Sequence, residues 1–129
     1  MVYLWIGIGG FLGANARYLL QVWAANQWGP EFPYGTLMAN VSGSFLITLF
    51  LTVMVYDIFP IPDEVRFFFA VGFLGSFTTF SSFSYETYLQ YSNRGWWWMG
   101  ANFFTNTLFG LIGVMLGLFV AGLIQKGWQ

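Results

Sequence analysis

The sequence has no cysteine and no histidine, and it carries only four basic and five acidic residues among its 129 positions. About a quarter of the residues of an ordinary soluble domain are charged, so a soluble globular protein is excluded. Without cysteine and histidine there is no disulfide framework, no thiolate nucleophile, no usual zinc ligand and no common general base, which argues against an enzyme. A net charge of -1 without a basic cluster argues against nucleic-acid binding.

Apolar residues make up 57% of the chain and collect in charge-poor runs. Four such runs lie at about 2–25, 35–56, 65–91 and 96–124, separated by short segments that contain proline, glycine or charged residues. Each run supplies the roughly 20 residues that a helix needs to cross a hydrocarbon layer. We therefore predict an all-α membrane protein, with residues 1–129 forming a single domain of four transmembrane helices.

The basic residues give no preferred orientation for such a bundle. Alternating helices place Arg66 and Lys126 on one side of the membrane, and Arg94 and Arg17 on the other. Since the excess of lysine and arginine in cytoplasmic loops sets orientation, this balance predicts insertion in both directions and antiparallel pairing of two copies. The alternative is a single orientation set by folding or by an insertase.

Polar residues inside the first two runs need partners. Arg17 is the only basic residue well inside a run, which indicates a structural anchor, an anion site or a side chain that snorkels to the interface. Every fourth residue of the second run is polar, and the stripe comprises Thr36, Asn40, Ser44 and Thr48. A stripe of this kind either joins helices by hydrogen bonds or lines a narrow wet path, in which the Asn40 amide would donate to an anion.

The third run contains an unusual number of small and polar residues between Gly72 and Ser84, which indicates a broken helix. No acidic residue lies within this segment, so backbone carbonyl oxygens are its only local cation ligands. Two copies meeting at a two-fold axis could form a four-oxygen site for a small monovalent cation. The alternative is an unbroken, closely packed helix rich in serine and threonine.

Within the same segment phenylalanines recur every three residues, at Phe77, Phe80 and Phe83, and Glu86 follows at the same spacing. This spacing predicts that the rings lie along one helix face, where aromatic residues usually form core. The positively polarised edges of the phenyl rings could also attract a small anion and carry it where no full positive charge exists. The fourth run supplies further hydrogen-bond donors at Asn102, Thr105, Asn106 and Thr107.

These segments resemble the Fluc (CrcB-type) fluoride channels along essentially the whole chain. The matching motifs are GGFLGANARY at 9–18, PYGTLMANVSGSF at 33–45 and GFLGSFTTFSSFSYE at 72–86. The resemblance implies antiparallel dual-topology homodimers of four-helix subunits in the bacterial inner membrane, with two fluoride pores and a central structural sodium ion that is not transported.

The resemblance also implies roles for individual residues. The pore residues would be Asn40, Phe80 and Phe83, with the pore-lining hydroxyls of Thr36, Ser81 and Ser82. The sodium ion would be held by the backbone carbonyls of Gly75 and Thr78, while Arg17 and Glu86 would be structural. In the fourth run Phe103 falls near a family tyrosine position and Thr107 near a hydroxyl position.

We therefore expect passive export of fluoride, which lowers its toxicity in the cytoplasm, with membrane lipid and a second copy as partners. A proton-coupled exporter of the small multidrug type is the alternative, but it needs an acidic residue deep in a helix, whereas the deep charge here is Arg17. A purely structural assembly factor is a third possibility, which would not need the polar break.

Overall fold

The computed structural model describes residues 1–128, and these residues are helical almost throughout. Three long helices are continuous: α1 (Val2–Trp28), α2 (Tyr34–Val55) and α6 (Trp96–Trp128). Between α2 and α6 the chain forms α3 (Asp63–Arg66), η1 (Phe67–Leu74), α4 (Gly75–Phe77) and α5 (Phe80–Arg94) in succession. With no strand among the described residues, the prediction of an all-α protein is confirmed.

The helix ends follow local backbone chemistry. Gly29 ends α1 with a φ of 85°, a conformation that favours glycine, and Pro30 follows it. Gly95 has a φ of 94° and separates α5 from α6, so the chain reverses in a single residue. Pro62 precedes α3, where its missing N–H costs no helical hydrogen bond.

The predicted break in the third run is confirmed and lies at Thr78 and Thr79. Both residues are extended, with φ −82° and ψ 156° at Thr78 and φ −153° and ψ 119° at Thr79. Before the break, η1 is an eight-residue π-helix. The sequence pattern did not indicate this wider helix, since π-helices carry no distinctive periodicity.

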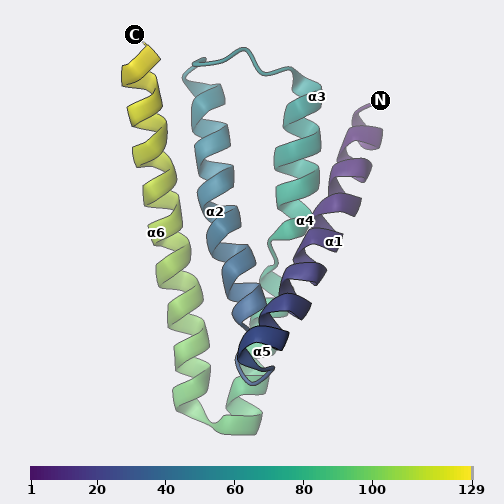
Figure 1. Ribbon diagram of the computed structural model, residues 1–129, viewed down its shortest axis with the longest axis vertical. Helices are drawn as coiled ribbons and strands as arrows, with labels where there is room; N and C mark the ends of the chain where they lie inside the picture. The colour runs from purple at the N-terminus through teal and green to yellow at the C-terminus, as the bar shows by residue number, and fades with distance from the viewer. Residues whose placement is uncertain (129) are drawn as a thin grey trace.

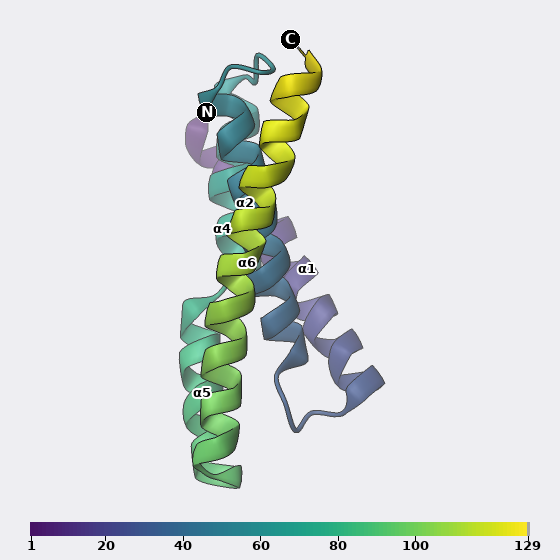
Figure 2. The same ribbon diagram turned by 90° about the vertical axis from the view of Figure 1, so that its left-hand side faces the viewer.

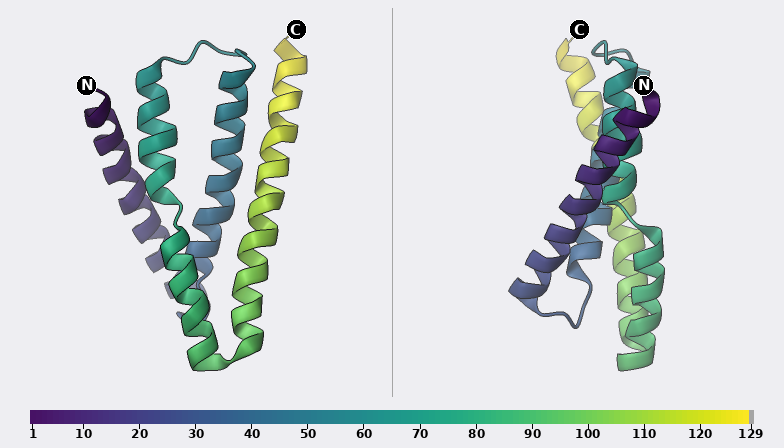
Figure 3. Two further views of the ribbon diagram at one scale, coloured as in Figure 1. Left: turned by 180° about the vertical axis from the view of Figure 1, so that it is seen from behind. Right: turned by 90° about the vertical axis from the view of Figure 1, so that its right-hand side faces the viewer.

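The two termini and the α2–α3 connection lie at one end of the molecule, and the α5–α6 turn lies at the other (Figure 1). Figure 2 shows α5 running alongside the first part of α6. Turned views show α1 crossing the α3–η1 segment at an angle, while α2 packs along α6 (Figure 3). The extended link between α4 and α5 lies at about mid-height in the molecule (Figure 3).

Glycines allow the backbones of α1 and η1 to come into direct contact. A Cβ atom added to Gly9 or Gly13 would overlap the carbonyl oxygen of Phe68 or Phe73. From the other side, a Cβ on Gly72 would lie 2.6 Å from the Ile6 carbonyl oxygen. The small residues thus permit a close approach of the two helices, as is typical of small residues spaced like Gly9 and Gly13.

Large apolar side chains cover the outside of the bundle, as expected for a protein surrounded by lipid rather than water. Along α6 they include Phe104, Leu108, Leu111, Met115 and Phe119, all of them exposed. Among residues 1–128, three helical segments are long and apolar enough to cross a membrane, namely Tyr34–Val55, Asp63–Arg94 and Trp96–Gly127. We conclude that the chain is an all-α membrane protein. Helix α1 has the length for a fourth crossing, but it is not among these three segments.

Candidate functional site

Side chains replace the helical hydrogen bonds that the break removes. In a continuous helix the Thr79 N–H would donate to the Gly75 carbonyl, but here it donates to Asn40 Oδ1 at 2.9 Å. The Ser82 N–H, which would donate to the Thr78 carbonyl, donates instead to Thr79 Oγ1 at 3.2 Å as an N-cap of α5. The carbonyls of Gly75 and Thr78 are thereby released from their usual helical donors.

Arg17 joins the end of α4 to α1. Its Nε donates a 3.1 Å hydrogen bond to the carbonyl oxygen of Ser76, which has lost its helical partner at the break. A positive charge is also favourable at the C-terminal end of a helix. Of the roles considered for Arg17, this contact supports the structural anchor.

A cavity of about 360 Å³ lies beside the break, between α2, α5 and α6. It contains four of the predicted pore residues, one from α2, two from α5 and one from α6, which are Asn40, Phe80, Phe83 and Thr107. The lining also includes Ser44, Thr78, Thr79 and Asn106. Asn40 and Thr107, which are 67 positions apart in the chain, thus meet at one place.

The two predicted pore phenylalanines, Phe80 and Phe83, have different environments. Their ring centroids are 5.8 Å apart, with the planes tilted by 56°. Phe80 is 79% exposed, whereas Phe83 is 9% exposed and packs against Phe103 with ring centroids 6.2 Å apart. The expectation that Phe77 continues this row is wrong: its ring stacks on Phe73 at 5.7 Å, because the two extended residues separate it from α5.

Few hydrogen-bond donors in this cavity are free. Asn40 Nδ2 donates to the Thr79 carbonyl at 3.2 Å and to Asn106 Oδ1 at 3.1 Å, so both amide hydrogens are used within the protein. The Thr107 hydroxyl donates to the Phe103 carbonyl in its own helix at 2.8 Å. The Ser44 hydroxyl has no hydrogen-bond partner among residues 1–128, and it lines the cavity. Ser44 is therefore a free donor, and the polar stripe of α2 was the signal for it.

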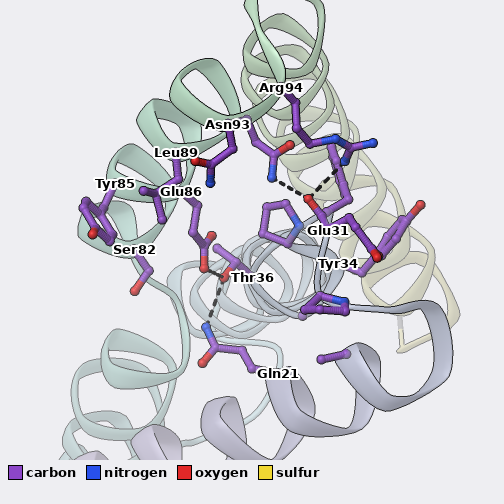
Figure 4. Close-up of a pocket in the computed structure, with 16 residues that line it drawn as sticks. Gln21, Glu31, Tyr34, Thr36, Ser82, Tyr85, Glu86, Leu89, Asn93 and Arg94 are labelled. Atoms are coloured by element: carbon purple, nitrogen blue, oxygen red, sulfur yellow. Dashed lines mark hydrogen bonds between the residues drawn. The ribbon is translucent and has the colours of Figure 1, made fainter.

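A second cavity, of about 680 Å³, lies between the α1–α2 loop and α5 and contains Thr36, Ser82 and Glu86 (Figure 4). Gln21 Nε2 donates to Thr36 Oγ1 at 3.0 Å, and Thr36 Oγ1 donates to Glu86 Oε1 at 2.8 Å. Because Gln21, Thr36 and Glu86 belong to α1, α2 and α5, these two hydrogen bonds tie the three helices together. Thr36, at the centre of the row, is 1% exposed.

The α1–α2 loop, which lines that cavity, is fastened to α5. The Glu31 carbonyl accepts hydrogen bonds from Gln90 Nε2 at 2.7 Å and from Arg94 Nη1 at 3.1 Å. The Arg94 guanidinium carbon also lies 3.3 Å from the centroid of the Trp98 ring, which is a cation–π contact. The two hydrogen bonds to the Glu31 carbonyl, drawn in Figure 4, hold the loop against the end of α5.

The structure thus divides the predicted site between two neighbouring cavities on either side of the first turn of α5. Ser81 lies in neither cavity; it is exposed, with its hydroxyl 3.4 Å from Thr79 Oγ1. Thr79 was not singled out from the sequence, although its place before an amphipathic segment matches a helix N-cap. Asn106 was noted only as a further donor, because Asn40, which donates to it, is 66 residues away in sequence.

Comparison with known proteins supports the resemblance. The family model described as CrcB-like protein, Camphor Resistance (CrcB), matches residues 4–118. A Legionella pneumophila (strain Philadelphia 1) protein named "Fluoride-specific ion channel FluC" is 43% identical over 98% of this chain and 94% of its own length. Proteins of the same name from Roseiflexus sp. (strain RS-1) and Rhodospirillum rubrum are 44% and 43% identical, over 90% and 98% of this chain and 93% and 99% of their own lengths. The chain therefore belongs to the CrcB-like protein family.

Proposed function

We propose that this protein is a fluoride-selective channel that lets fluoride leave the bacterial cytoplasm passively across the inner membrane. The observation that carries this proposal is the cavity beside the break, where Phe80 and Phe83 meet polar side chains. The proteins named as fluoride channels are 43% identical over nearly the whole chain, which supports the same function here. Since those relatives are named as channels, we set the proton-coupled exporter aside.

In this mechanism fluoride enters through the 680 Å³ cavity and passes the first turn of α5 into the 360 Å³ cavity. Ser82 lines the wider cavity and Ser81 lies on the first turn of α5, so both contribute hydroxyls along the way. Thr36 lines the wider cavity too, but its hydroxyl hydrogen is donated to Glu86, so it shapes the wall. In the narrower cavity the positive edges of the Phe80 and Phe83 rings and the free Ser44 hydroxyl replace water around the ion. Asn40 lines the path, but its amide hydrogens are engaged by Thr79 and Asn106, so its main contribution is to shape the wall.

Fluoride efflux from sealed vesicles tests this function. Purified protein is reconstituted into liposomes loaded with potassium fluoride, and external fluoride is measured after a potassium ionophore is added. We expect rapid efflux that saturates with the protein-to-lipid ratio, and none from protein-free vesicles. Matched vesicles loaded with potassium chloride test selectivity. Equal efflux of chloride, or no efflux of fluoride by the folded protein, would contradict the proposal.

We also propose a structural sodium ion at the break, which the Gly75 and Thr78 carbonyls of each of two subunits would hold. Support comes from the release of both carbonyls from their helical donors, to which Asn40 and the Thr79 hydroxyl contribute. Residues 1–128 contain no group of three or more acidic, cysteine or histidine side chains that could hold a metal. Neutral carbonyl ligands suit a monovalent ion better than calcium, which usually recruits carboxylates.

Replacing sodium by a bulky organic cation is expected to destabilise the dimer. An ion that binds the assembled state stabilises it by about 2.7 kcal/mol at 100 times its Kd, so its removal lowers the thermal midpoint of dimer dissociation. Thr78→Ser is the matched control, because it keeps the backbone carbonyl and a hydroxyl able to donate to Leu74 as Thr78 Oγ1 does at 3.0 Å. Unchanged stability and flux after hours of equilibration without sodium would refute the ion.

The functional unit that we propose is an antiparallel homodimer of four-helix subunits, in which α1 also crosses the membrane. The 79% exposed Phe80 ring beside an open cavity supports a second copy at this face. Both termini lie at one end of the molecule, as an even number of crossings requires (Figure 1). The exposed apolar side chains of α6 would contact lipid.

Because basic residues do not favour either orientation, C-terminal reporter fusions are expected to appear on both faces of the membrane in comparable amounts. Three lysines added beside Lys126 should retain this end in the cytoplasm and lower fluoride flux when that variant is expressed alone. Three glutamines at the same place are the control, since they change length without charge. A reporter signal from a single face of the membrane for the unmodified chain would contradict dual insertion.

A further inference from the structure

A row of hydrogen-bonded side-chain amides joins the break to α6 and returns to α5. The Thr79 N–H donates to Asn40 Oδ1 at 2.9 Å, and Asn40 Nδ2 donates to Asn106 Oδ1 at 3.1 Å. Asn106 Nδ2 then donates to Asn102 Oδ1 at 3.0 Å, and Asn102 Nδ2 donates to Thr87 Oγ1 at 2.8 Å. We call Asn40, Asn106 and Asn102 the amide ladder.

The ladder ends one turn from where it begins. Thr87 Oγ1 donates to the Phe83 carbonyl at 2.6 Å, while the starting N–H belongs to Thr79, next to Phe80. Every link donates in the same direction, from the break toward the Phe83 carbonyl, so neighbouring bonds polarise one another favourably. The first turn of α5, which carries both pore phenylalanines, is thus held at both of its ends.

The α6 members of the ladder have little to offer the ion, because both are buried, although Asn106 also lines the narrower cavity. Asn102 is 0% exposed and Asn106 is 7% exposed. Asn106 Nδ2 bonds to both the carbonyl and the side-chain oxygen of Asn102, at 3.2 and 3.0 Å. A buried amide that is fully engaged in this way orients its neighbours and has no hydrogen left to give to an anion.

We propose that Asn106 and Asn102 are positioning residues: by orienting Asn40 they hold Thr79, and with it the Phe80 and Phe83 rings, in the geometry that passes the ion. This inference rests on the proposed channel function and assigns residues that do not contact fluoride. Asn40 is the connecting member, since its amide pairs with both the N–H and the carbonyl of Thr79.

The first test is structural and needs no fluoride. Hydrogen exchange of the peptide that contains the Thr79 N–H is measured in the wild-type protein, in Asn106→Leu and in Thr105→Val. Thr105 is the matched control, because its hydroxyl donates only to carbonyls of its own helix, at 2.6 and 3.3 Å. We expect faster exchange at Thr79 in Asn106→Leu alone. Exchange that equals the wild-type rate would overturn the proposal, even if the protein conducts no fluoride.

The second test separates positioning from contact with the ion. Asn106→Leu is expected to lower maximal fluoride flux per folded protein by about 10-fold or more, because small displacements of an organised site are costly, without shifting the fluoride concentration for half-maximal flux. In an Asn40→Ala background the same change should have no further effect, since the ladder is already cut. Additive losses, or a shifted half-maximal concentration, would show direct contact and overturn the proposal.

Thr87→Val covers the case in which Asn106→Leu fails to fold. Valine has nearly the shape of threonine but cannot accept from Asn102 or donate to the Phe83 carbonyl, so it cuts the last link of the ladder. We expect a smaller loss of maximal flux in the same direction, with faster exchange at Thr79. Wild-type flux together with wild-type exchange in this variant would overturn the proposal. A wild-type protein without fluoride flux would instead refute the channel function and leave the exchange result to decide on the ladder.

Discussion

Phe80→Ile is expected to lower fluoride flux by about 100-fold, the order of loss seen when a group directed at an anion in a dry site is removed. Isoleucine keeps apolar bulk but has no positive ring edge. Because the Phe80 ring is 79% exposed in the subunit, the substitution should leave the folding of the subunit almost unchanged. Flux is measured per folded dimer, so that any loss of protein is counted separately.

Phe83→Ile should lower fluoride flux to a similar extent. It should also lower the stability of the protein, since Phe83 is 9% exposed and packs against Phe103. Phe119→Ile is the control: that ring is 63% exposed on α6, away from both cavities. If the two phenylalanines were only packing residues, Phe80→Ile would conduct like the wild-type protein and Phe83→Ile would merely melt earlier. That pattern would contradict the role of the ring edges.

Gly13→Ala is expected to cost about 3 kcal/mol or more of stability, at the upper end of the range for overpacking, because the new methyl group meets backbone and not a movable side chain. A Cβ at this position would overlap the carbonyl oxygen of Phe73 in η1. Helix α1 would have to move away from η1, which carries the chain into the break. Both the thermal midpoint and fluoride flux should therefore fall.

Gly7→Ala provides the matched control in the same helix, since a Cβ there has no neighbouring atom within 4 Å. It should be neutral or slightly stabilising, because the new methyl group meets nothing and alanine favours the helix more than glycine does. Thermal midpoints of both variants, measured in the same detergent, check the comparison. Equal midpoints for Gly13→Ala and the wild-type protein would show that α1 and η1 are not tightly packed.

The existence of the break could be predicted from sequence, whereas its hydrogen-bond partners could not. Small and polar residues between Gly72 and Ser84 are a local signal, and local signals are readable from one segment. The amide that takes the Thr79 N–H belongs to Asn40, 39 residues earlier, and it is oriented by Asn106, 66 residues beyond Asn40. Such pairings depend on how the helices pack.

The glycines illustrate the same limit. By sequence, Gly75 and Gly13 look equally suited to a close approach, but a Cβ on Gly75 would be 3.8 Å from the Ala70 carbonyl oxygen, an ordinary contact. Gly75 is also in the right-handed helical conformation that any residue adopts. Its backbone carbonyl, and not its missing side chain, is what the proposed sodium ion would use. Only the packed structure distinguishes a glycine that is needed for close helix packing, such as Gly13, from a residue whose backbone carbonyl is needed, such as Gly75.

The amide ladder has a consequence for protons as well as for the proposed fluoride path. A proton travels along hydrogen-bonded water or hydroxyl groups because each oxygen can accept one proton and release another. A side-chain amide accepts at oxygen and donates at nitrogen, so it does not pass a proton onward in this way. Three successive amides, Asn40, Asn106 and Asn102, therefore interrupt any such relay between the break and Thr87. Protons would therefore not leak along this row of side chains, and release of fluoride would not dissipate the proton gradient by this route.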